Sequence, residues 1–447
     1  MVKLWTPALV LAAVLLKMTT TSTQGKGTNP LVIKGYRFFD AVTGQYFGMR
    51  GVNYYPRPNA GALDANNLDF FTNQNQHIWG RDLPQFSAGI YVIVDLGSSC
   101  KGCEITPDKA PACYPASYKK RGEKIIQNFS KYDNVIGFSG GNEVNHRTGG
   151  NPPEWNAPCQ KKFVRDMRAY IKSCPTMRQI PVGLVVADTN RDDNAQYYNC
   201  RTDPQDELEN AEWYGINTYV HCGDSEDPAV GSGFEQLKKS FDGYKYSIPT
   251  IITEFGCTSE GFPTVNGFGG QRTFHDAKWM NQKRFSEHFN GGFVFEYSTE
   301  NANSKSTVPY PFKKAGPQNY GLGYFTPESC DDVATPCEFV RFPNFDSLAK
   351  AYNSTDTSTE PTLQTFTPAS DRTKPTTCPA AWPKLKDLQW EGDAAKSEAC
   401  PQVTRYQCPY VPIGQAKITL QETTSGEVSR QENAVLASGV MVAVLAL

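Results

Sequence analysis

A chain of 447 residues has room for one large domain with an appendage, or for two medium domains. Its formal net charge of −2 gives no electrostatic reason to expect nucleic acid or an anionic membrane surface as the main partner. Hydrophobic residues (39%) are at the level of a soluble globular protein, and aromatic residues (12%) are plentiful. This balance favours a neutral substrate such as a sugar, although most aromatic side chains are expected in the core.

The first residues have the pattern of a secretory signal. Lys3 precedes an apolar stretch at 4–16, and small and polar residues follow as far as Gly25. This order predicts a signal peptide over residues 1–24, because the stretch is too short to span a bilayer as a mature helix. A helix of the protein core is the alternative.

Short apolar, β-prone runs alternate with amphipathic helical patterns between residues 31 and 325. Continuous apolar character is typical of parallel strands buried on both faces, and the alternation predicts a (β/α)8 barrel. The expected strands are 46–54, 89–96, 135–139, 180–186, 213–219, 249–253 and 292–297. Helices are expected at 118–132 and 161–173, among others.

Seven expected strands are one fewer than a closed barrel needs. Residues 81–86 run directly into 87–91, with no strand or helix where the second βα unit should be. The sequence therefore predicts a TIM-type catalytic domain over 25–350 that lacks its second βα unit. Beyond it, frequent Pro, Thr and Ser predict a linker at 351–377, followed by a short Cys-containing tail at 378–425.

Two of the expected strands end in a glutamate. Glu143 follows Asn142, and Glu254 ends the run that begins at Ile248. Working residues of such barrels lie at the C-terminal ends of the strands, so the two carboxyls should meet. Retaining glycosidases place two carboxyls about 5–5.5 Å apart, one to protonate the leaving oxygen and one to attack the anomeric carbon. We expect Glu143 to be the acid/base and Glu254 to be the nucleophile, held in place by the hydroxyl of Tyr219.

The nearby charge of Glu254 should raise the pKa of Glu143 in the free protein. The alternative for both glutamates is that they are strand-end charges engaged in salt bridges.

Thirteen cysteines in a secreted chain favour disulfides over metal ligands, and the odd number leaves at least one without a partner in the chain. Cys100 and Cys103 form a Cys-X-X-Cys motif, but the chain has only five histidines, which argues against zinc or redox chemistry. Asn128 and Asn353 begin N-glycosylation acceptor motifs, which agrees with secretion.

The last residues, 434–447, are apolar. They follow a polar stretch at 427–433 and the small residues Ser425 and Gly426. This order is typical of the attachment signal for a glycosylphosphatidylinositol (GPI) anchor, which predicts a removable propeptide over 426–447. An unprocessed apolar tail is the alternative.

Several motifs together resemble the GPI-anchored 1,3-β-glucanosyltransferases, glycoside hydrolase family 72. They occur in order between about residues 31 and 325: Gly51-Val52-Asn53-Tyr54-Tyr55, residues 88–96, Gly141-Asn142-Glu143, residues 180–183, residues 215–219 with Cys222-Gly223, and residues 253–257. The resemblance implies a (β/α)8 enzyme that cuts within a 1,3-β-glucan chain and joins the new reducing end to another chain.

The resemblance also implies roles for individual residues. Glu143 would be the acid/base and Glu254 the nucleophile. Sugar-binding positions would be Tyr54, Asp95, Asn142, Tyr219 and Tyr297, with Asp188 and Arg191 in an acceptor-side loop at 188–200. The implied partners are donor and acceptor 1,3-β-glucan chains, with no cofactor, metal or nucleic acid. The chain would be a monomer, GPI-anchored on the outer face of the plasma membrane and present in the cell wall.

Two departures from the family keep alternatives open. Between the motifs at 82–84 and 88–92 the family has a strand with a substrate-stacking tyrosine and a helix, and this chain lacks that block; Tyr55 stands where the family tends to have an amide. An endo-1,3-β-glucanase would use the same carboxylates. A catalytically impaired glucan-binding wall protein would follow from the missing block. A metal-dependent enzyme has little support, because no His/Asp/Glu cluster has ligand spacing.

Overall fold

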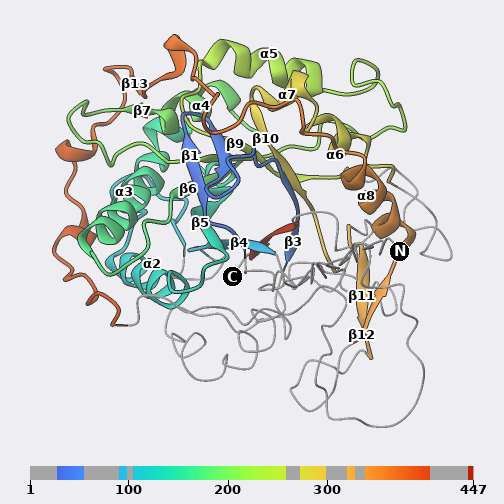
Figure 1. Ribbon diagram of the computed structural model, residues 1–447. Coiled ribbons are helices and arrows are strands. Elements are labelled where there is room, and N and C mark those ends of the chain that lie inside the picture. Colours follow the sequence, from blue (N-terminus) through green and yellow to red (C-terminus); the bar gives the residue numbers. More distant parts are fainter. Residues whose placement is uncertain are drawn as a thin grey trace, which may run out of the picture.

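The centre of the fold is a closed parallel β-barrel, seen in a computed structural model that describes residues 28–54, 90–97, 104–257, 272–298, 320–327, 338–402 and 441–445 (Figure 1). In order around the barrel, the strands are β10 (Phe289–Val294), β3 (Met49–Tyr54), β14 (Met441–Leu445), β4 (Tyr91–Asp95), β5 (Val135–Asn142), β6 (Val182–Ala187), β8 (Tyr214–Asn217) and β9 (Thr250–Phe255). Every pairing between neighbours is parallel. All seven strands expected from the sequence are confirmed, and so is the TIM-type class.

The place of the second strand is taken by β14, from the C-terminal end of the chain. Val442 pairs with Gly51 of β3 on one side and with Tyr91 of β4 on the other. The strand therefore lies where the sequence predicts that a βα unit is missing. Residues 55–89, the predicted signal peptide, Cys100 and Cys103 lie outside the described residues.

The inside of the barrel is filled by large side chains. They form one cluster: Phe38, Phe47, Met49, Tyr91, Ile93, Ile136, Val185, Trp213, Ile251 and Phe293. The indole of Trp213 fits because Gly183 on the neighbouring strand has no side chain; a Cβ there would lie 2.2 Å from the Trp213 ring. Close packing of this kind leaves no room for an added methyl group.

An N-terminal hairpin closes the face of the barrel where the strands begin. It consists of β1 (Leu31–Lys34) and β2 (Arg37–Asp40), and its Phe38 enters the interior cluster. The side chain of Asn290 in β10 accepts from Phe38 N at 3.2 Å and donates to Tyr36 O at 3.0 Å. The sequence did not predict this hairpin.

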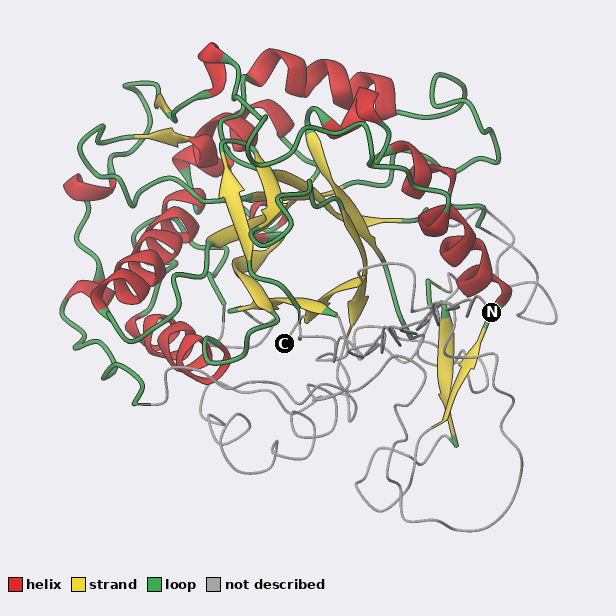
Figure 2. Cartoon of the chain, viewed as in Figure 1, coloured by secondary structure: helices red, strands yellow, loops and turns green. Residues whose placement is uncertain are grey.

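Helices pack along the outside of the barrel on three sides of the view (Figure 2). They are α2 (Ala116–Phe129), α3 (Ala157–Ser173), α4 (Arg191–Asn199), α5 (Phe234–Tyr244), α6 (His275–Trp279), α7 (Lys283–Ser286) and α8 (Pro343–Asn353). The short 3-10 helices are η2 (Val144–His146), η3 (Pro152–Glu154), η5 (Ser370–Arg372), η6 (Leu385–Asp387) and η7 (Glu391–Asp393). The helices expected at 118–132 and 161–173 are confirmed as α2 and α3.

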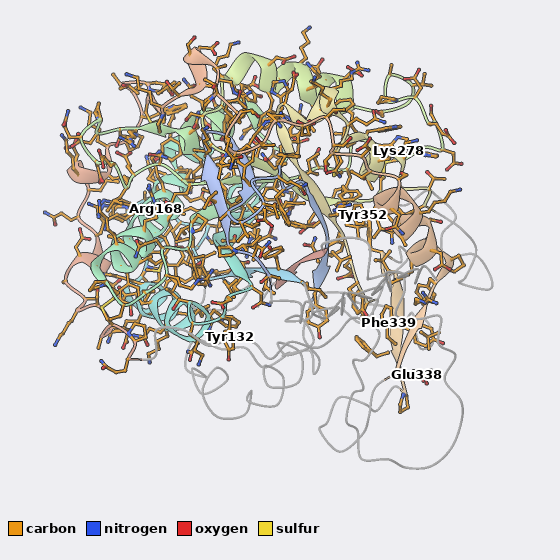
Figure 3. All side chains as sticks on the ribbon, in the orientation of Figure 1. Tyr132, Arg168, Lys278, Glu338, Phe339 and Tyr352 are labelled. Atoms are coloured by element: carbon orange, nitrogen blue, oxygen red, sulfur yellow. A yellow bond between two sulfur atoms is a disulfide. The ribbon has the colours of Figure 1, made fainter. Side chains whose placement is uncertain are left out.

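Amphipathic spacing explains how the helices attach. α3 buries Phe163, Met167, Tyr170 and Ile171, which recur every three or four residues on one face. On α8, the hydroxyl of Tyr352, labelled in Figure 3, donates to Gly51 O at 2.8 Å and accepts from Gly51 N at 3.2 Å. This side chain fixes α8 against β3. Among the described residues, no helix has the length and apolar character that crossing a membrane requires.

Two pairs of short strands complete the fold. β11 (Gly323–Thr326) and β12 (Glu338–Arg341) form an antiparallel pair, and β7 (Cys200–Arg201) pairs in parallel with β13 (Thr376–Thr377).

Residues 354–402, which we call the strap, pack along the outside of the barrel. Arg37 of β2 and Glu360 form an ion pair of 2.5 Å, with 4% and 2% of their side chains exposed. Phe366 packs against Phe39, with ring centroids 5.5 Å apart. The structure therefore corrects the predicted linker at 351–377, because this segment packs against the barrel. Its low apolar content gave no sign of the few side chains, such as Glu360 and Phe366, that make buried contacts.

Disulfides hold the strap and the loops, as predicted from the cysteine content. Two of them tie the strap to the barrel domain, and two join parts of that domain. The pairs are Cys113–Cys159, Cys174–Cys400, Cys200–Cys378 and Cys222–Cys257. The other five of the thirteen cysteines lie outside the described residues.

Candidate active site

The loop that carries Glu143 begins where β5 ends. Glu143 has a left-handed backbone conformation, with φ 52° and ψ 31°, which is unfavourable for a residue with a Cβ atom. The bond from Glu143 N to Val185 O at 3.0 Å holds this turn against β6. Asn145 adds two bonds to Ala187, donating to its carbonyl and accepting from its N–H at 2.9 Å each. Strain fixed by its surroundings is typical of functional positions.

The second carboxylate, Glu254, lies near the end of β9. The hydroxyl of Tyr219, two residues after β8, donates to Glu254 Oε2 at 2.8 Å. This is the contact that we expected from the sequence. It fixes the direction of the carboxylate of the candidate nucleophile.

Asn217, at the end of β8, connects the two carboxylate strands. Its Nδ2 donates to Asn142 Oδ1 and to Glu143 Oε1, each at 3.0 Å. Its Oδ1 accepts from Thr253 Oγ1 at 2.7 Å, one residue before Glu254. Sequence reasoning missed Asn217 as a site residue. The available signal was a third strand of the barrel that ends on a polar side chain.

The surroundings of Glu254 favour its protonated form. Burial raises the pKa of Glu254 to about 8, the negative charge of Glu143 raises it as well, and hydrogen bonds from Tyr219 and Asn217 oppose the shift. Although part of the side chain is exposed, the carboxyl group itself is enclosed by protein. At neutral pH the free protein therefore favours a neutral Glu254.

Tyr54 and Tyr297 lie together next to Asn53, which bonds the strand of Glu254. Their rings meet edge to face, with centroids 5.8 Å apart. Tyr297 N donates to Asn53 O at 2.9 Å, and Asn53 Nδ2 donates to Thr253 O at 3.1 Å. The structure thus brings both predicted sugar-binding tyrosines to the strand that carries Glu254.

Asp188 and Arg191 also lie at this edge of the barrel. Arg191 forms two bonds of 2.6 Å to the Asp188 carboxylate, a bidentate geometry that adds strength and direction. Thr218 Oγ1 donates to Asp188 Oδ2 at 2.6 Å, and Thr218 N donates to Glu254 O at 2.9 Å. The predicted acceptor-side pair is therefore connected to the candidate nucleophile through Thr218.

Asn142 and Asp95 complete the predicted set. Asn142 is exposed at the end of β5. Asp95 ends β4 and is buried; burial raises its pKa to about 7, while a bond from Gly97 N and the charge of Arg121 on α2 oppose the shift. The contacts of Asp95 lead to α2 and to Ser139 on β5, the strand that ends at Asn142, beside Glu143. Within the described ranges, no group of three or more His, Cys, Asp or Glu residues is arranged to hold a metal.

Known proteins share this arrangement of sequence and fold. Residues 83–308, about half of the chain, match the family described as glucanosyltransferase, glycoside hydrolase family 72. The chain is 32% identical over 327 residues to 1,3-beta-glucanosyltransferase GAS5 of Saccharomyces cerevisiae, covering 67% of this chain and 61% of the relative. It is 33% identical over 294 residues to 1,3-beta-glucanosyltransferase gas4 of Schizosaccharomyces pombe, covering 61% of each.

A solved structure has the same fold. It is Saccharomyces cerevisiae Gas2p in complex with laminaripentaose, with a TM-score of 0.57 and 24% identity, and the match covers 79% of this chain and 74% of that chain. The chain spans 61% of the length of the two curated relatives named above. On the family match, the chain belongs to the glucanosyltransferases of glycoside hydrolase family 72.

Proposed function

We propose that the protein is a retaining transglycosylase that cleaves 1,3-β-glucan chains internally and transfers the new reducing end to another chain. The observation that carries the proposal is the link from Glu143 through Asn217 to the strand of Glu254. The activity named for the relatives, and the laminaripentaose bound to Gas2p, support 1,3-β-glucan as the substrate.

In the first step, the Glu254 carboxylate attacks the anomeric carbon while Glu143 gives its proton to the departing glycosidic oxygen. The bond from carbon to that oxygen breaks, and an ester bond from carbon to Glu254 forms. The departing chain leaves with its new hydroxyl group. Tyr219 holds the Glu254 carboxylate in place through its bond to Oε2.

In the second step, Glu143 acts as the base. It accepts the proton of a hydroxyl group at the end of an acceptor glucan chain, whose oxygen attacks the anomeric carbon and releases Glu254. Two displacements give net retention of configuration. Asn217, which donates to Glu143 Oε1, holds this carboxylate through both steps.

Glu254 must be charged before the first step. Burial raises the pKa of that carboxyl to about 8, so the free protein favours its neutral form. A sugar hydroxyl that donates to Glu254 would favour its charged form, since hydrogen bonding to a carboxylate lowers its pKa. Binding of the donor chain would thereby produce the attacking carboxylate.

Tyr54 and Tyr297 are proposed to support donor sugar rings, and Asp188 with Arg191 to contact the acceptor. Asp95 and Asn142 are proposed to bond sugar hydroxyls. No cofactor is needed for this chemistry.

We further propose that the protein is a secreted monomer, GPI-anchored at the cell surface and present in the cell wall. Four disulfides suit an oxidising compartment. The signal peptide at 1–24 and the propeptide at 426–447 remain predictions from the sequence. Removal of this propeptide would take β14 out of the barrel and leave β3 and β4 without their shared neighbour. Release of the surface protein by a phosphatidylinositol-specific phospholipase would test the anchor.

The activity is tested by incubating the protein with a laminari-oligosaccharide whose reducing end has been reduced to the alditol. Products longer than the substrate are expected. Shorter products alone would make the protein an endo-1,3-β-glucanase. Binding without turnover, unchanged in Glu254→Gln, would make it a glucan-binding wall protein.

A further inference from the structure

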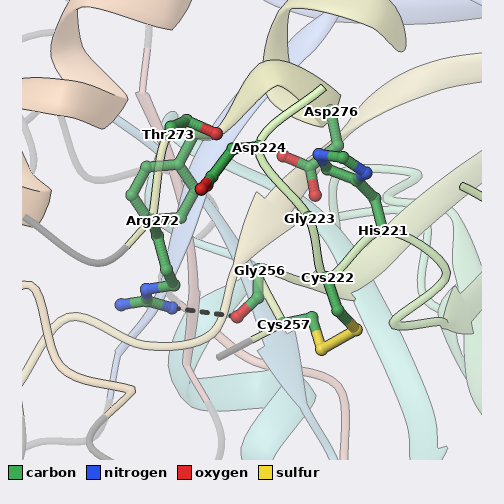
Figure 4. A pocket seen from close by; sticks show the side chains of 10 residues that line it. His221, Cys222, Gly223, Asp224, Gly256, Cys257, Arg272, Thr273 and Asp276 are labelled. Carbon is green, nitrogen blue, oxygen red and sulfur yellow. Dashed lines mark hydrogen bonds between the residues drawn. A yellow bond between two sulfur atoms is a disulfide. The ribbon is translucent and has the colours of Figure 1, made fainter. Parts of the chain in front are cut away.

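A buried arginine lies beside the proposed nucleophile strand. Arg272, three residues before α6, is 4% exposed. Its guanidinium points towards Gly256 and the Cys222–Cys257 disulfide, in a pocket that His221, Thr273 and Asp276 also line (Figure 4). The roles proposed above for catalysis and sugar binding do not use this side chain.

The guanidinium joins three segments at the C-terminal end of the barrel. Nη1 donates to Gly256 O at 3.1 Å and to Phe295 O at 2.9 Å. Nη2 donates to Tyr320 O, and to Gly321 O at 3.5 Å. One side chain therefore bonds the main chain just after β9, just after β10 and just before β11.

These segments surround the tyrosine that bonds Glu254. Gly256 is two residues from Glu254, and Phe295 N donates to Phe255 O at 3.0 Å. The ring of Tyr320 lies 6.0 Å from the Tyr219 ring and 5.5 Å from the Phe295 ring, centroid to centroid. Movement of Tyr320 would change the support of Tyr219, and movement of Gly256 would change the support of Glu254.

The charge and shape of the side chain suit this task. Burial lowers the pKa of Arg272 to about 10, and Tyr219 and Asp276 oppose the shift, so the guanidinium stays charged at neutral pH. Hydrogen bonds from a charged donor are stronger than neutral ones. The planar guanidinium reaches several acceptors at once, which the single ammonium group of a lysine does not reproduce.

We propose that Arg272 is a positioning residue that fixes the Tyr219–Glu254 hydrogen bond through Gly256 and Tyr320. This inference rests on the proposed function, because the Tyr219–Glu254 bond matters for catalysis only if Glu254 is the nucleophile. Arg272 would then belong to the site through the main-chain groups that it bonds, without touching the substrate.

The test compares Arg272→Lys with Arg372→Lys. Arg372 is a matched control: it is 8% exposed, lies on the strap over the Tyr36 ring, and donates to Tyr246 O at 2.7 Å and Glu287 O at 3.1 Å. Both substitutions keep the charge and remove bonds from a buried guanidinium to main-chain carbonyls. Of the two arginines, Arg272 bonds the segment that follows the strand of Glu254, and Arg372 bonds main-chain carbonyls under the strap.

The readout is the pH at which Glu254 loses its proton, followed by carboxyl carbon NMR as a difference from Glu254→Gln. The Tyr219 bond lowers the pKa of Glu254, so a displaced Tyr219 raises that midpoint. We expect the titration midpoint of Glu254 to rise in Arg272→Lys and to stay unchanged in Arg372→Lys. We also expect kcat to fall about tenfold or more in Arg272→Lys and to stay unchanged in Arg372→Lys. In a Tyr219→Phe background, Arg272→Lys should add no further shift.

An unchanged midpoint in Arg272→Lys, with a loss of stability like that of Arg372→Lys, would overturn the proposal. Should Arg272→Lys fail to fold, Tyr320→Leu makes the same test, because it removes the ring contact and keeps the main-chain acceptors; an unmoved midpoint there overturns the proposal equally. The NMR midpoint needs no turnover. A shifted midpoint in a protein without transferase activity would therefore refute the proposed function and leave the positioning role standing.

Discussion

The side-chain amide of Asn217 donates to the Glu143 carboxylate at 3.0 Å. The same amide accepts from Thr253, so it connects two strands that are separated by β6 and β8 in the barrel. The distance between the two proposed catalytic carboxyls therefore depends on a residue between them.

Removing this amide should lower the rate of transfer. Asn217→Ala leaves Glu143 without its donor and Thr253 without its acceptor, and we expect kcat to fall about 10–100-fold, as for other displaced catalytic groups. Asn290→Ala is the control, since this fully buried asparagine bonds the hairpin at the opposite face of the barrel. It should lower stability and preserve kcat; equal kcat in both variants would contradict the role of Asn217.

The two glutamates should differ in how their variants are rescued. Glu254→Ala should lose activity by about 10⁴-fold or more, and Glu143→Ala by about 10²–10⁴-fold. Added azide should restore glycosyl azide formation with an activated donor, giving the α product in Glu254→Ala and the β product in Glu143→Ala. The anomeric configuration is read by proton NMR, and the reverse pattern would exchange the two roles.

Glu254 should make folding stability dependent on pH. Its pKa rises from the model-compound value of 4.5 to about 8 on folding, so the folded state holds a proton that the unfolded state releases. The proton on Glu254 therefore contributes to the free energy of unfolding in full below pH 4.5, and this contribution is lost as pH rises towards 8. Glu254→Gln, which stays neutral, should gain on the order of 1–3 kcal/mol relative to wild type between pH 5 and 9, after allowance for partial exposure.

Urea unfolding of both proteins across this range measures the difference. Glu287→Gln serves as a control for loss of a carboxylate away from the site. A constant gap between wild type and Glu254→Gln would show that the carboxyl titrates at its ordinary pKa.

The strap should depend on its buried ion pair. Arg37→Met leaves Glu360 charged and without its cation, which costs about 3–5 kcal/mol for a buried pair. The double variant Arg37→Met/Glu360→Leu should recover most of this loss, because neither charge remains. Chemical denaturation measures the free energy of unfolding of the single and the double variant. Transfer activity of both variants at low temperature should be unchanged. Equal losses in the single and double variants would argue against a coupled pair.

The contact of Gly183 with Trp213 should not tolerate a methyl group. Gly183→Ala places a Cβ 2.2 Å from the indole, and we expect a loss of about 1–3 kcal/mol from overpacking. Gly223→Ala is the matched control, since no atom lies within 4 Å of its added Cβ. Thermal unfolding of the two variants makes the comparison; similar values would mean that the barrel interior relaxes around Trp213.

The strands and the carboxylate pair could be predicted because their signals are local. Runs such as 135–138 contain no polar side chain, and Glu143 and Glu254 are charges that follow such runs, where burial requires a reason. Asn217 could not be ranked in the same way, because an amide at a strand end is common. Its importance comes from two partners that are distant in sequence.

The strap and β14 were missed for a different reason. A Pro/Thr/Ser-rich composition reports average polarity, whereas the strap is held by a few contacts such as Phe366 on Phe39 and by two disulfides. β14 pairs with strands more than 340 positions away in the sequence, and no local pattern states which strands it joins. Long-range pairing is decided by the whole fold.

The Cys174–Cys400 disulfide fixes the end of the strap to one face of the barrel. α3 follows the Glu143 loop and runs back to the face where β6 starts, and Cys174 comes directly after its last residue. Residue 400 is therefore fastened to the side opposite the carboxylates. With the proposed anchor attached beyond the strap, the face that carries Glu143 and Glu254 would point outwards, away from the surface.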